Sequence, residues 1–221
     1  MQYIGLAADY DGTLAKDGVV SAETIQALTR WRETGRYLLM VTGRELHDLS
    51  RVFDATKIFH RIVAENGAVI FDPQEERFTL SGMKPPEEFI EELRKRGVSP
   101  ISLGHIIVAT WTPHENTVLE TIRDLGLEMQ VIFNKGAVMI LPSGVNKASG
   151  LQLALQELGL SLQNIAGIGD AENDHAFLNI VGFSAATSNA LDSLKKNVNF
   201  VTSASHGAGV RELIEKLLAE D

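Results

Sequence analysis

The sequence predicts an α/β protein, in which a parallel sheet carries helices on both faces and a small α+β segment is inserted. Two observations lead to this prediction. Short apolar runs alternate with segments of helical periodicity over residues 3–67 and again from residue 146 onward, and this order is typical of parallel sheets. Between these regions the order becomes helix, strand, helix, strand, strand, which suits a separate α+β unit.

The first elements follow from periodicity and from one capping residue. The apolar runs YIGLAA and RYLLMVTG predict two buried strands. Between them, apolar residues recur at helical spacing from Ala22 to Trp31, behind Ser21, which is a favoured N-cap residue. A second helix is expected over residues 45–55, and RIVAENG predicts the third strand.

The chain then departs from this pattern. AVIFDPQEERFTL predicts a hairpin whose turn begins at Asp72-Pro73. The segment that follows is expected to contain the helix PPEEFIEELRKRG, the strand HIIVATW, the helix HENTVLETIRDLG and the strands MQVIFN and AVMILP. These boundaries divide the chain into a core of residues 1–81 and 144–221 and an insert of residues 82–143.

The α/β order resumes after the insert. NKASGLQLALQELG predicts a helix, NIAGIGD a strand, ENDHAFLNIVG a helix, GFSAAT a strand and NALDSLKKN a helix. The last helix presents an apolar stripe made of Val210, Leu213, Ile214 and Leu217. The predicted core is therefore a Rossmann-like parallel sheet with helices on both faces.

Composition limits the classes of function. The 221 residues carry a formal net charge of −9, which argues against nucleic acid as a partner because phosphate backbones require clustered Lys and Arg. There is no cysteine, so disulfides and thiolate metal sites are excluded. The first apolar run is too short for a signal peptide or a membrane span. We therefore expect a cytoplasmic protein with no membrane partner, either monomeric or homodimeric.

Polar residues follow the ends of three predicted strands and the start of one helix. Because the carboxyl ends of parallel strands meet at one edge of a sheet, these side chains are expected to converge there. The set comprises Asp9, Asp11, Thr42, Gly43, Arg44, Lys147, Asp170, Asn173 and Asp174. Each motif alone has an ordinary explanation, such as a solvated turn or an acidic helix start. Their order along one sheet indicates a shared site.

The chemistry of this set points to phosphate. Four clustered carboxylates repel one another unless a cation lies among them, and oxygen ligands without cysteine favour Mg²⁺. Lys147, Arg44 and the Thr42-Gly43 pair offer donors suited to phosphate oxygens. The combination indicates phosphoryl chemistry on a small anionic substrate, in which positioning and charge neutralisation supply most of the catalysis.

The chain resembles the haloacid dehalogenase (HAD) superfamily of phosphohydrolases. It is most similar to the Cof-like branch, whose type IIB α+β cap lies between the second and third motifs. DYDGTL resembles the first motif, VTGR the second, Lys147 in GVNKASG the third and GDAENDHAF the fourth, and AENGA also fits the branch. The resemblance covers nearly the whole chain and implies that residues 82–143 form a cap that sets substrate specificity.

The resemblance implies catalytic and metal-binding roles for the acidic residues. Asp9 would be the nucleophile that forms an aspartyl-phosphate, and Asp11 would be the general acid and base. Asp9, the Asp11 carbonyl and Asp170 would hold Mg²⁺. Asp174 and Asn173 would complete the metal site by orienting bound water or phosphate.

The resemblance also implies a phosphate-binding set. Thr42, Gly43 and Lys147 would bind the phosphate together with Asn173. Arg44 would either join them or brace neighbouring carboxylates, and both readings stay open.

The candidate specificity residues lie in the predicted cap. They are Asn134 and Lys135, with His114, Glu115 and Trp111 on an earlier cap segment. Trp111 and Phe133 are expected in the cap core and not at a stacking surface. The cap is short for its branch, which implies a modest substrate or a partly open site.

Together these features predict a Mg²⁺-dependent phosphatase of a small phosphorylated metabolite, such as a sugar phosphate or a phosphoglycolate-like compound. Many members of the branch carry an acidic residue where this chain has Met139, so an expected acceptor for sugar hydroxyls is missing. Two alternatives remain: a phosphotransferase or phosphomutase of the same superfamily, and a catalytically silent phosphometabolite-binding module. The intact motif residues favour an active enzyme.

Overall fold

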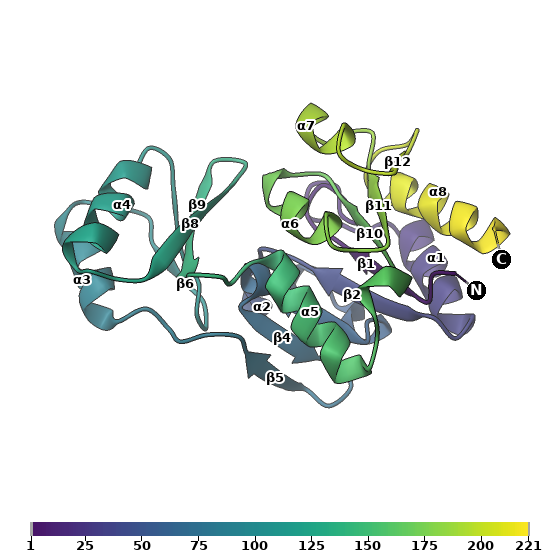
Figure 1. Cartoon of the computed structure of the whole chain (residues 1–221), viewed down its shortest axis with the longest axis horizontal. Helices are drawn as coiled ribbons and strands as arrows, with labels where there is room; N and C mark the ends of the chain where they lie inside the picture. Colours follow the sequence, from purple (N-terminus) through teal and green to yellow (C-terminus); the bar gives the residue numbers. More distant parts are fainter. Residues whose placement is uncertain (1, 221) are drawn as a thin grey trace.

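The computed structural model describes residues 2–220, and within them the chain forms two sheets. The larger sheet has eight strands in the order β12-β11-β10-β1-β2-β3-β4-β5, and the smaller has four in the order β6-β7-β9-β8. Figure 1 shows the two sheets side by side along the long axis of the molecule, with the smaller sheet and its helices at one end. The division of the chain at residues 82 and 143 stays a prediction.

Six strands of the larger sheet are parallel. They are β1 (Gly5–Ala8), β2 (Tyr37–Val41), β3 (Arg61–Ala64), β10 (Ile165–Gly169), β11 (Phe183–Ala186) and β12 (Phe200–Val201). The predicted hairpin adds two antiparallel strands at one edge, β4 (Val69–Asp72) and β5 (Arg77–Leu80). The predicted α/β fold with a mostly parallel sheet is therefore confirmed.

Helices cover both faces of this sheet. They are α1 (Ala22–Glu33), α2 (Leu46–Val52), α5 (Lys147–Leu158), α6 (His175–Leu178), α7 (Asp192–Lys195) and α8 (His206–Ala219), with 3-10 turns η1 (Ala55–Ile58), η2 (Glu65–Gly67), η3 (Leu162–Asn164) and η4 (Glu172–Asp174). Because side chains alternate along a strand, Leu6 of β1 packs in the same cluster as Trp31 of α1, whereas Ala7 packs in the opposite cluster with Leu151 of α5. Ser21 caps α1 as predicted, accepting a hydrogen bond from the N–H of Thr24.

The smaller sheet is antiparallel and packs against two helices. Its strands are β6 (Ser102–Leu103), β7 (Val108–Trp111), β8 (Met129–Asn134) and β9 (Ala137–Pro142), and its helices are α3 (Glu87–Lys95) and α4 (Glu115–Asp124). Phe89 and Val118 from the helices and Val108 from β7 share one buried cluster. The opposite face of the sheet holds Met139 and turns toward the core.

The helix predicted at ENDHAFLNIVG is shorter in the structure. The segment ENDHAFLNIVG begins as the 3-10 turn η4, and α6 spans only His175–Leu178. The carboxylate of Asp174 accepts hydrogen bonds from the backbone N–H groups of Asp170 and Ala171, and this turn occupies the start of the expected helix. The two-residue strands β6 and β12 were not predicted, because a periodicity of two cannot be read over so short a run.

Candidate active site

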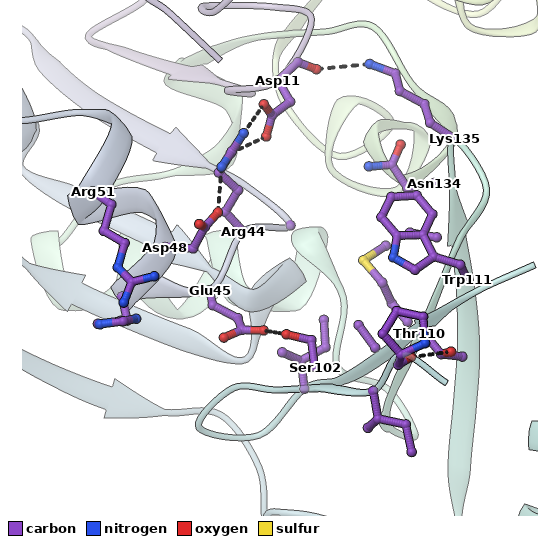
Figure 2. Close-up of a pocket in the computed structure, with 18 of the residues that line it drawn as sticks. Asp11, Arg44, Glu45, Asp48, Arg51, Ser102, Thr110, Trp111, Asn134 and Lys135 are labelled. Carbon is purple, nitrogen blue, oxygen red and sulfur yellow. Dashed lines mark hydrogen bonds and ion pairs between the residues drawn. The ribbon is translucent and has the colours of Figure 1, made fainter. Parts of the chain in front are cut away.

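The predicted site residues converge at the carboxyl ends of β1, β2 and β10, where a pocket of about 710 Å³ opens between the two sheets. The core side of the pocket includes Asp9, Asp11 and Arg44, and the opposite side includes Trp111 and Lys135. Figure 2 shows these two sides facing each other, with a link from Lys135 to Asp11 and another from Ser102 to Glu45. The pocket is thus shared by the core and the predicted cap.

The turn after β1 brings both aspartates to this edge. The backbone of Gly12 has a φ of +90°, which is open to glycine at little cost. A Cβ atom on Gly12 would lie 2.3 Å from Asp170 Oδ2 and 2.6 Å from Lys135 Nζ. The hydroxyl of Thr13 donates to Asp170 Oδ1 over 3.0 Å. The glycine therefore lets two distant acidic segments approach each other.

Lys147 lies between two buried carboxylates. Its Nζ is 2.6 Å from Asp9 Oδ1 and 2.6 Å from Asp174 Oδ1. Burial alone would lower the pKa of Lys147, but Asp174 and Asp9 outweigh burial, and the pKa is raised well above its usual range. Asn146, the N-cap of α5, fixes the start of the helix by accepting hydrogen bonds from the N–H groups of Ala148 and Ser149. Lys147 therefore stays charged and aligns Asp9 with Asp174.

Asp9 needs positive charge nearby to act as a nucleophile. Burial raises the pKa of Asp9 well above its ordinary value, and Asp174 raises it further, although Lys147 acts in the opposite direction. A protonated carboxyl group is a poor nucleophile. Ionised Asp9 is therefore favoured by any further cation placed beside it.

The acidic residues fit a hard cation. Asp9, Asp170 and Asp174 each offer one oxygen, and these atoms lie within 4.8 Å of one another. The ammonium of Lys135 already sits among such oxygens, 2.8 Å from Asp170 Oδ2 and 3.1 Å from the Asp11 carbonyl. The donor set consists of oxygen atoms, as Mg²⁺ prefers. The residues of this chain are thus suited to hold a divalent cation.

Arg44 braces acidic side chains. Its Nε and Nη2 donate to Asp11 over 2.6 and 2.8 Å, and its Nη1 donates to Asp48 over 2.5 Å. Figure 2 shows the guanidinium between the two carboxylates. Hydrogen bonding to Asp11 raises the pKa of Arg44 even further above its high ordinary value. The sequence left open whether Arg44 binds phosphate or braces neighbouring carboxylates, and this geometry matches the second role.

Thr42, Gly43 and Asn173 lie along the same rim. The Thr42 hydroxyl is buried and accepts a hydrogen bond from the N–H of Arg44 over 3.1 Å, so in this arrangement it supports the turn. Gly43 lines the pocket beside the amide of Asn173. That amide donates to Asn66 Oδ1 over 2.9 Å, whereas Asn173 Oδ1 and Asn66 Nδ2 are buried with no hydrogen-bond partner among residues 2–220. These two unpaired groups mark a polar position next to the carboxylates.

Not every predicted specificity residue reaches the pocket. Asn134 and Lys135, at the turn between β8 and β9, line it. His114 does not, and its Nε2 lies 3.0 Å from the carbonyl of Ser99. The expectation that Trp111 and Phe133 lie in the cap core is wrong: they are 53% and 45% exposed, and Trp111 lines the pocket.

The exposure of Trp111 follows from side-chain alternation along β7. Val108 points toward α3 and α4, whereas Ala109 and Trp111 belong to the face that lines the pocket. The apolar run HIIVATW does not reveal which side chains face the pocket. Apolar residues are found on both faces of this strand, since helices cover one face and the pocket lies against the other.

Glu65 is a residue that sequence reasoning missed. It follows β3, is fully buried, and accepts hydrogen bonds from the N–H groups of His105, Ile106 and Ile107 over 2.8, 2.9 and 3.1 Å. The ring Nδ1 of His105 lies 2.9 Å from the same carboxylate. An acidic residue directly after the apolar run RIVA is the signal that could have revealed it. Glu65 joins the core to the segment before β7.

Comparison with known proteins agrees with these motifs. The sequence model of the haloacid dehalogenase-like hydrolases matches residues 6–99 and 105–214. A phosphoglycolate phosphatase of Methanothermobacter thermautotrophicus is 31% identical over 220 residues, which cover 96% of this chain and 98% of that protein. A 5-amino-6-(5-phospho-D-ribitylamino)uracil phosphatase of Bacillus subtilis is 25% identical, over 95% of this chain and 93% of its own length.

Solved structures share the fold. A haloacid dehalogenase-like hydrolase from Bacteroides thetaiotaomicron has a TM-score of 0.81 at 19% identity, covering 97% of this chain and 99% of that chain. A HAD subclass IIB sugar phosphatase has a TM-score of 0.79 at 18% identity, covering 96% and 98% of the two chains. Within residues 2–220, no helix has the length and apolar character needed to cross a bilayer. The four motifs at one sheet edge and the match over most of the sequence show that the chain belongs to the haloacid dehalogenase-like hydrolase family.

Proposed function

We propose that this chain is a Mg²⁺-dependent phosphatase that hydrolyses a small phosphorylated metabolite through an aspartyl-phosphate on Asp9. The observation that carries the proposal is the meeting of Lys147, Asp170 and Asp174 around Asp9, which lines the pocket together with Asp11. The phosphatase names of the relatives support a phosphomonoester as substrate. A phosphoglycolate-like compound and a sugar phosphate are both compatible with this class.

Asp9, the Asp11 carbonyl and Asp170, with Asp174, are the groups that would hold Mg²⁺. When bound, the ion would offset the repulsion between Asp9 and a phosphate dianion. Lys147 orients the Asp9 carboxylate through its contact with Oδ1. The N–H of Gly43, which lines the pocket, would be a donor to the phosphate. The amide of Asn173 bonds Asn66 through one hydrogen and would have a second to offer.

The reaction proceeds in two displacements. A carboxylate oxygen of Asp9 attacks phosphorus, the bond from phosphorus to the leaving oxygen breaks, and Asp11 gives that oxygen its proton. Asp11 then accepts a proton from water as the water attacks phosphorus, and the bond to Asp9 breaks to release phosphate. Arg44 holds both Asp11 oxygens, so Asp11 must leave this ion pair to serve as the acid.

Solvent access favours hydrolysis over phosphoryl transfer to a second substrate. The Asp11 side chain is 38% exposed, and a mutase must instead exclude water from its phosphorylated intermediate. The presence of the complete acidic set with Lys147 also argues against a silent binding module.

The test is phosphate release from a panel of phosphomonoesters that includes 2-phosphoglycolate and several sugar phosphates, with Mg²⁺ or with a chelator. We expect turnover that requires Mg²⁺ and that Asp9→Asn abolishes. Intact-protein mass spectrometry after a rapid acid quench should detect one phosphoryl group on the wild-type chain and none on Asp9→Asn. Full turnover after exhaustive chelation, or an adduct on another residue, would refute the proposal.

A further inference from the structure

We propose that the pocket wall formed by the predicted cap binds a flat conjugated ring against Trp111, so that the substrate is a phosphomonoester with an aromatic or heteroaromatic group. This inference rests on the proposed phosphatase function and narrows its substrate class. It is argued from the chemistry of the two pocket walls, from the exposure of one indole and from the size of the cavity.

The two walls of the pocket differ in chemistry. Charged side chains line the core wall, among them Asp11, Arg44, Asp48 and Arg51. The opposite wall is mainly apolar and consists largely of Pro100, Ile101, Ile107, Ala109, Ala137 and Met139. The charged residue on that wall, Lys135, is paired with Asp170 at the acidic end. A phosphate therefore fits the core wall, and an uncharged organic body fits the other.

Trp111 gives this apolar wall an aromatic surface. Its side chain is 53% exposed in the pocket, although the other tryptophan, Trp31, is fully buried. Figure 2 shows the indole beside Asn134, across the pocket from Asp48 and Arg51. An exposed indole with few rotatable bonds is suited to stacking on a flat ring.

The size of the cavity agrees with such a substrate. A volume of about 710 Å³ lies within the range of about 300–1,000 Å³ that encloses ligands of drug size. A two-carbon phosphoester would contact only the charged end and leave the apolar wall and Trp111 in water. Burying that wall against a ring removes apolar surface from water and so favours binding.

The decisive experiment compares benzyl phosphate with cyclohexylmethyl phosphate and 2-phosphoglycolate. The first two share a similar shape and a primary alcohol as leaving group, and differ in the aromatic face. We expect the wild-type chain to prefer benzyl phosphate. Trp111→Ala should lower the ratio of the benzyl to the cyclohexylmethyl kcat/KM roughly tenfold, as stacking on an aromatic residue warrants. The change should lie in KM, and Trp111→Phe should restore much of the ratio.

A matched control is available on β8 of the same sheet. Phe133 is also an exposed aromatic residue, but it lies outside the pocket lining. Phe133→Ala should leave the benzyl-to-cyclohexylmethyl ratio unchanged. An equal loss in both variants would assign Trp111 to cap stability and overturn the proposal.

A binding measurement tests the stacking without turnover. In a chain carrying Trp31→Phe and Asp9→Asn, Trp111 is the sole tryptophan, and 4-nitrobenzyl phosphate should quench its fluorescence saturably. Lack of quenching would overturn the proposal. So would a benzyl-to-cyclohexylmethyl ratio of kcat/KM that is near one in the wild-type chain and unchanged by Trp111→Ala. Lack of Asp9-dependent phosphate release from all three substrates would instead refute the phosphatase function, whereas the quenching result would still decide the stacking.

Discussion

At the scale of single residues, the site is a set of buried charges that must neutralise one another. Lys147 offsets Asp9 and Asp174, while Asp170 faces the ammonium of Lys135. Arg44 holds Asp11 at the pocket surface. The two aspartates that follow β1 therefore lie in different surroundings, Asp9 buried against a lysine and Asp11 half-exposed against an arginine, which suits them to different chemical tasks.

Asp11→Asn should separate the two halves of the reaction. The variant keeps the backbone carbonyl but cannot transfer a proton, and loss of one acid–base catalyst costs about 10²–10⁴-fold. An activated aryl phosphate needs little protonation to leave, so we expect one rapid equivalent of aryl alcohol followed by slow turnover, with phosphate trapped on Asp9. Rapid-quench kinetics with mass spectrometry measure this. Uniformly slow release with no trapped adduct would contradict the assignment of Asp11.

Lys135→Met should strengthen Mg²⁺ binding. The Lys135 ammonium lies 2.8 Å from Asp170 Oδ2 and must move before a divalent cation can use that oxygen. The side chain is 49% exposed, and exposed ion pairs contribute about 0.2–1 kcal/mol, so we expect up to a roughly fivefold lower dissociation constant. Isothermal titration calorimetry measures it, with Lys135→Arg as the control that keeps the charge. Weaker Mg²⁺ binding by the methionine variant would show that Lys135 assists the cation.

At the scale of elements, one short connection ties the site together. The segment from β3 to β4 contains Glu65 and Asn66, both with positive φ. Glu65 binds the backbone of residues 105–107, and Asn66 binds the amide of Asn173. One turn therefore links the predicted cap to the segment that carries Asp170 and Asp174.

Glu65→Gln should loosen this link. The NH₂ group of the glutamine would face the N–H groups of residues 105–107 and could not accept their hydrogen bonds. A buried polar group left unpaired lowers the free energy of unfolding by about 1–3 kcal/mol. We expect urea denaturation to show a loss of this size, and hydrogen exchange to become faster at the amides of residues 105–107. Glu75→Gln, which alters an exposed pair with Arg77, is the control and should change neither. Unchanged exchange at residues 105–107 in the Glu65 variant would contradict the proposed link.

The free energy of unfolding should depend on pH through His60, which lies just before β3 and contacts β2. Its Nδ1 accepts a hydrogen bond from the N–H of Leu38, and burial lowers its pKa. The unfolded chain takes up a proton near pH 6.5, whereas the folded chain does so only at lower pH, so the free energy of unfolding should fall as the pH drops below about 6.5. Urea titrations between pH 7 and 5 should show a smaller fall for His60→Asn. The exposed His47→Asn serves as control, and equal slopes in all three chains would refute this role.

At the scale of the whole molecule, the site is made by two sheets that meet. The core supplies the acidic residues and the smaller sheet supplies the apolar wall, with Lys135 and the link between Ser102 and Glu45 crossing between them. Under the proposed function, we expect the reaction to depend on the core and substrate choice to depend on the wall that the smaller sheet supplies.

Mg²⁺ should stabilise the whole fold. Three carboxylates lie within 4.8 Å of one another, and Lys147 and Lys135 offset only part of their charge. A ligand at 100 times its dissociation constant adds about 2.7 kcal/mol to the free energy of unfolding. Thermal and urea unfolding of dialysed protein, with and without Mg²⁺, measure the gain. Ca²⁺ should also stabilise but should inhibit turnover, because it prefers more ligands at longer distances. Asp170→Asn should abolish the gain, and a gain of equal size in that variant would place the cation elsewhere.

The sequence by itself determined the order of elements and the place of the acidic edge. Apolar periodicity is a local property, so the strands of the core other than β12, α1 with its Ser21 cap and the buried stripe of α8 could be predicted without any knowledge of contacts. The rule that ligands bind at the carboxyl ends of parallel strands was enough to place Asp9 and Asp170 together.

Only the tertiary structure decided which partner each side chain meets. Lys135 reaches the carbonyl of a residue 124 positions away, Arg44 pairs with Asp11, Glu65 binds the backbone of residues 105–107, and Trp111 faces the pocket. These contacts depend on how two sheets pack against each other, and no periodicity along the chain encodes that packing. Apolar residues occur both at buried positions and at pocket-facing positions of one strand. The apolar run in the sequence therefore does not distinguish the two.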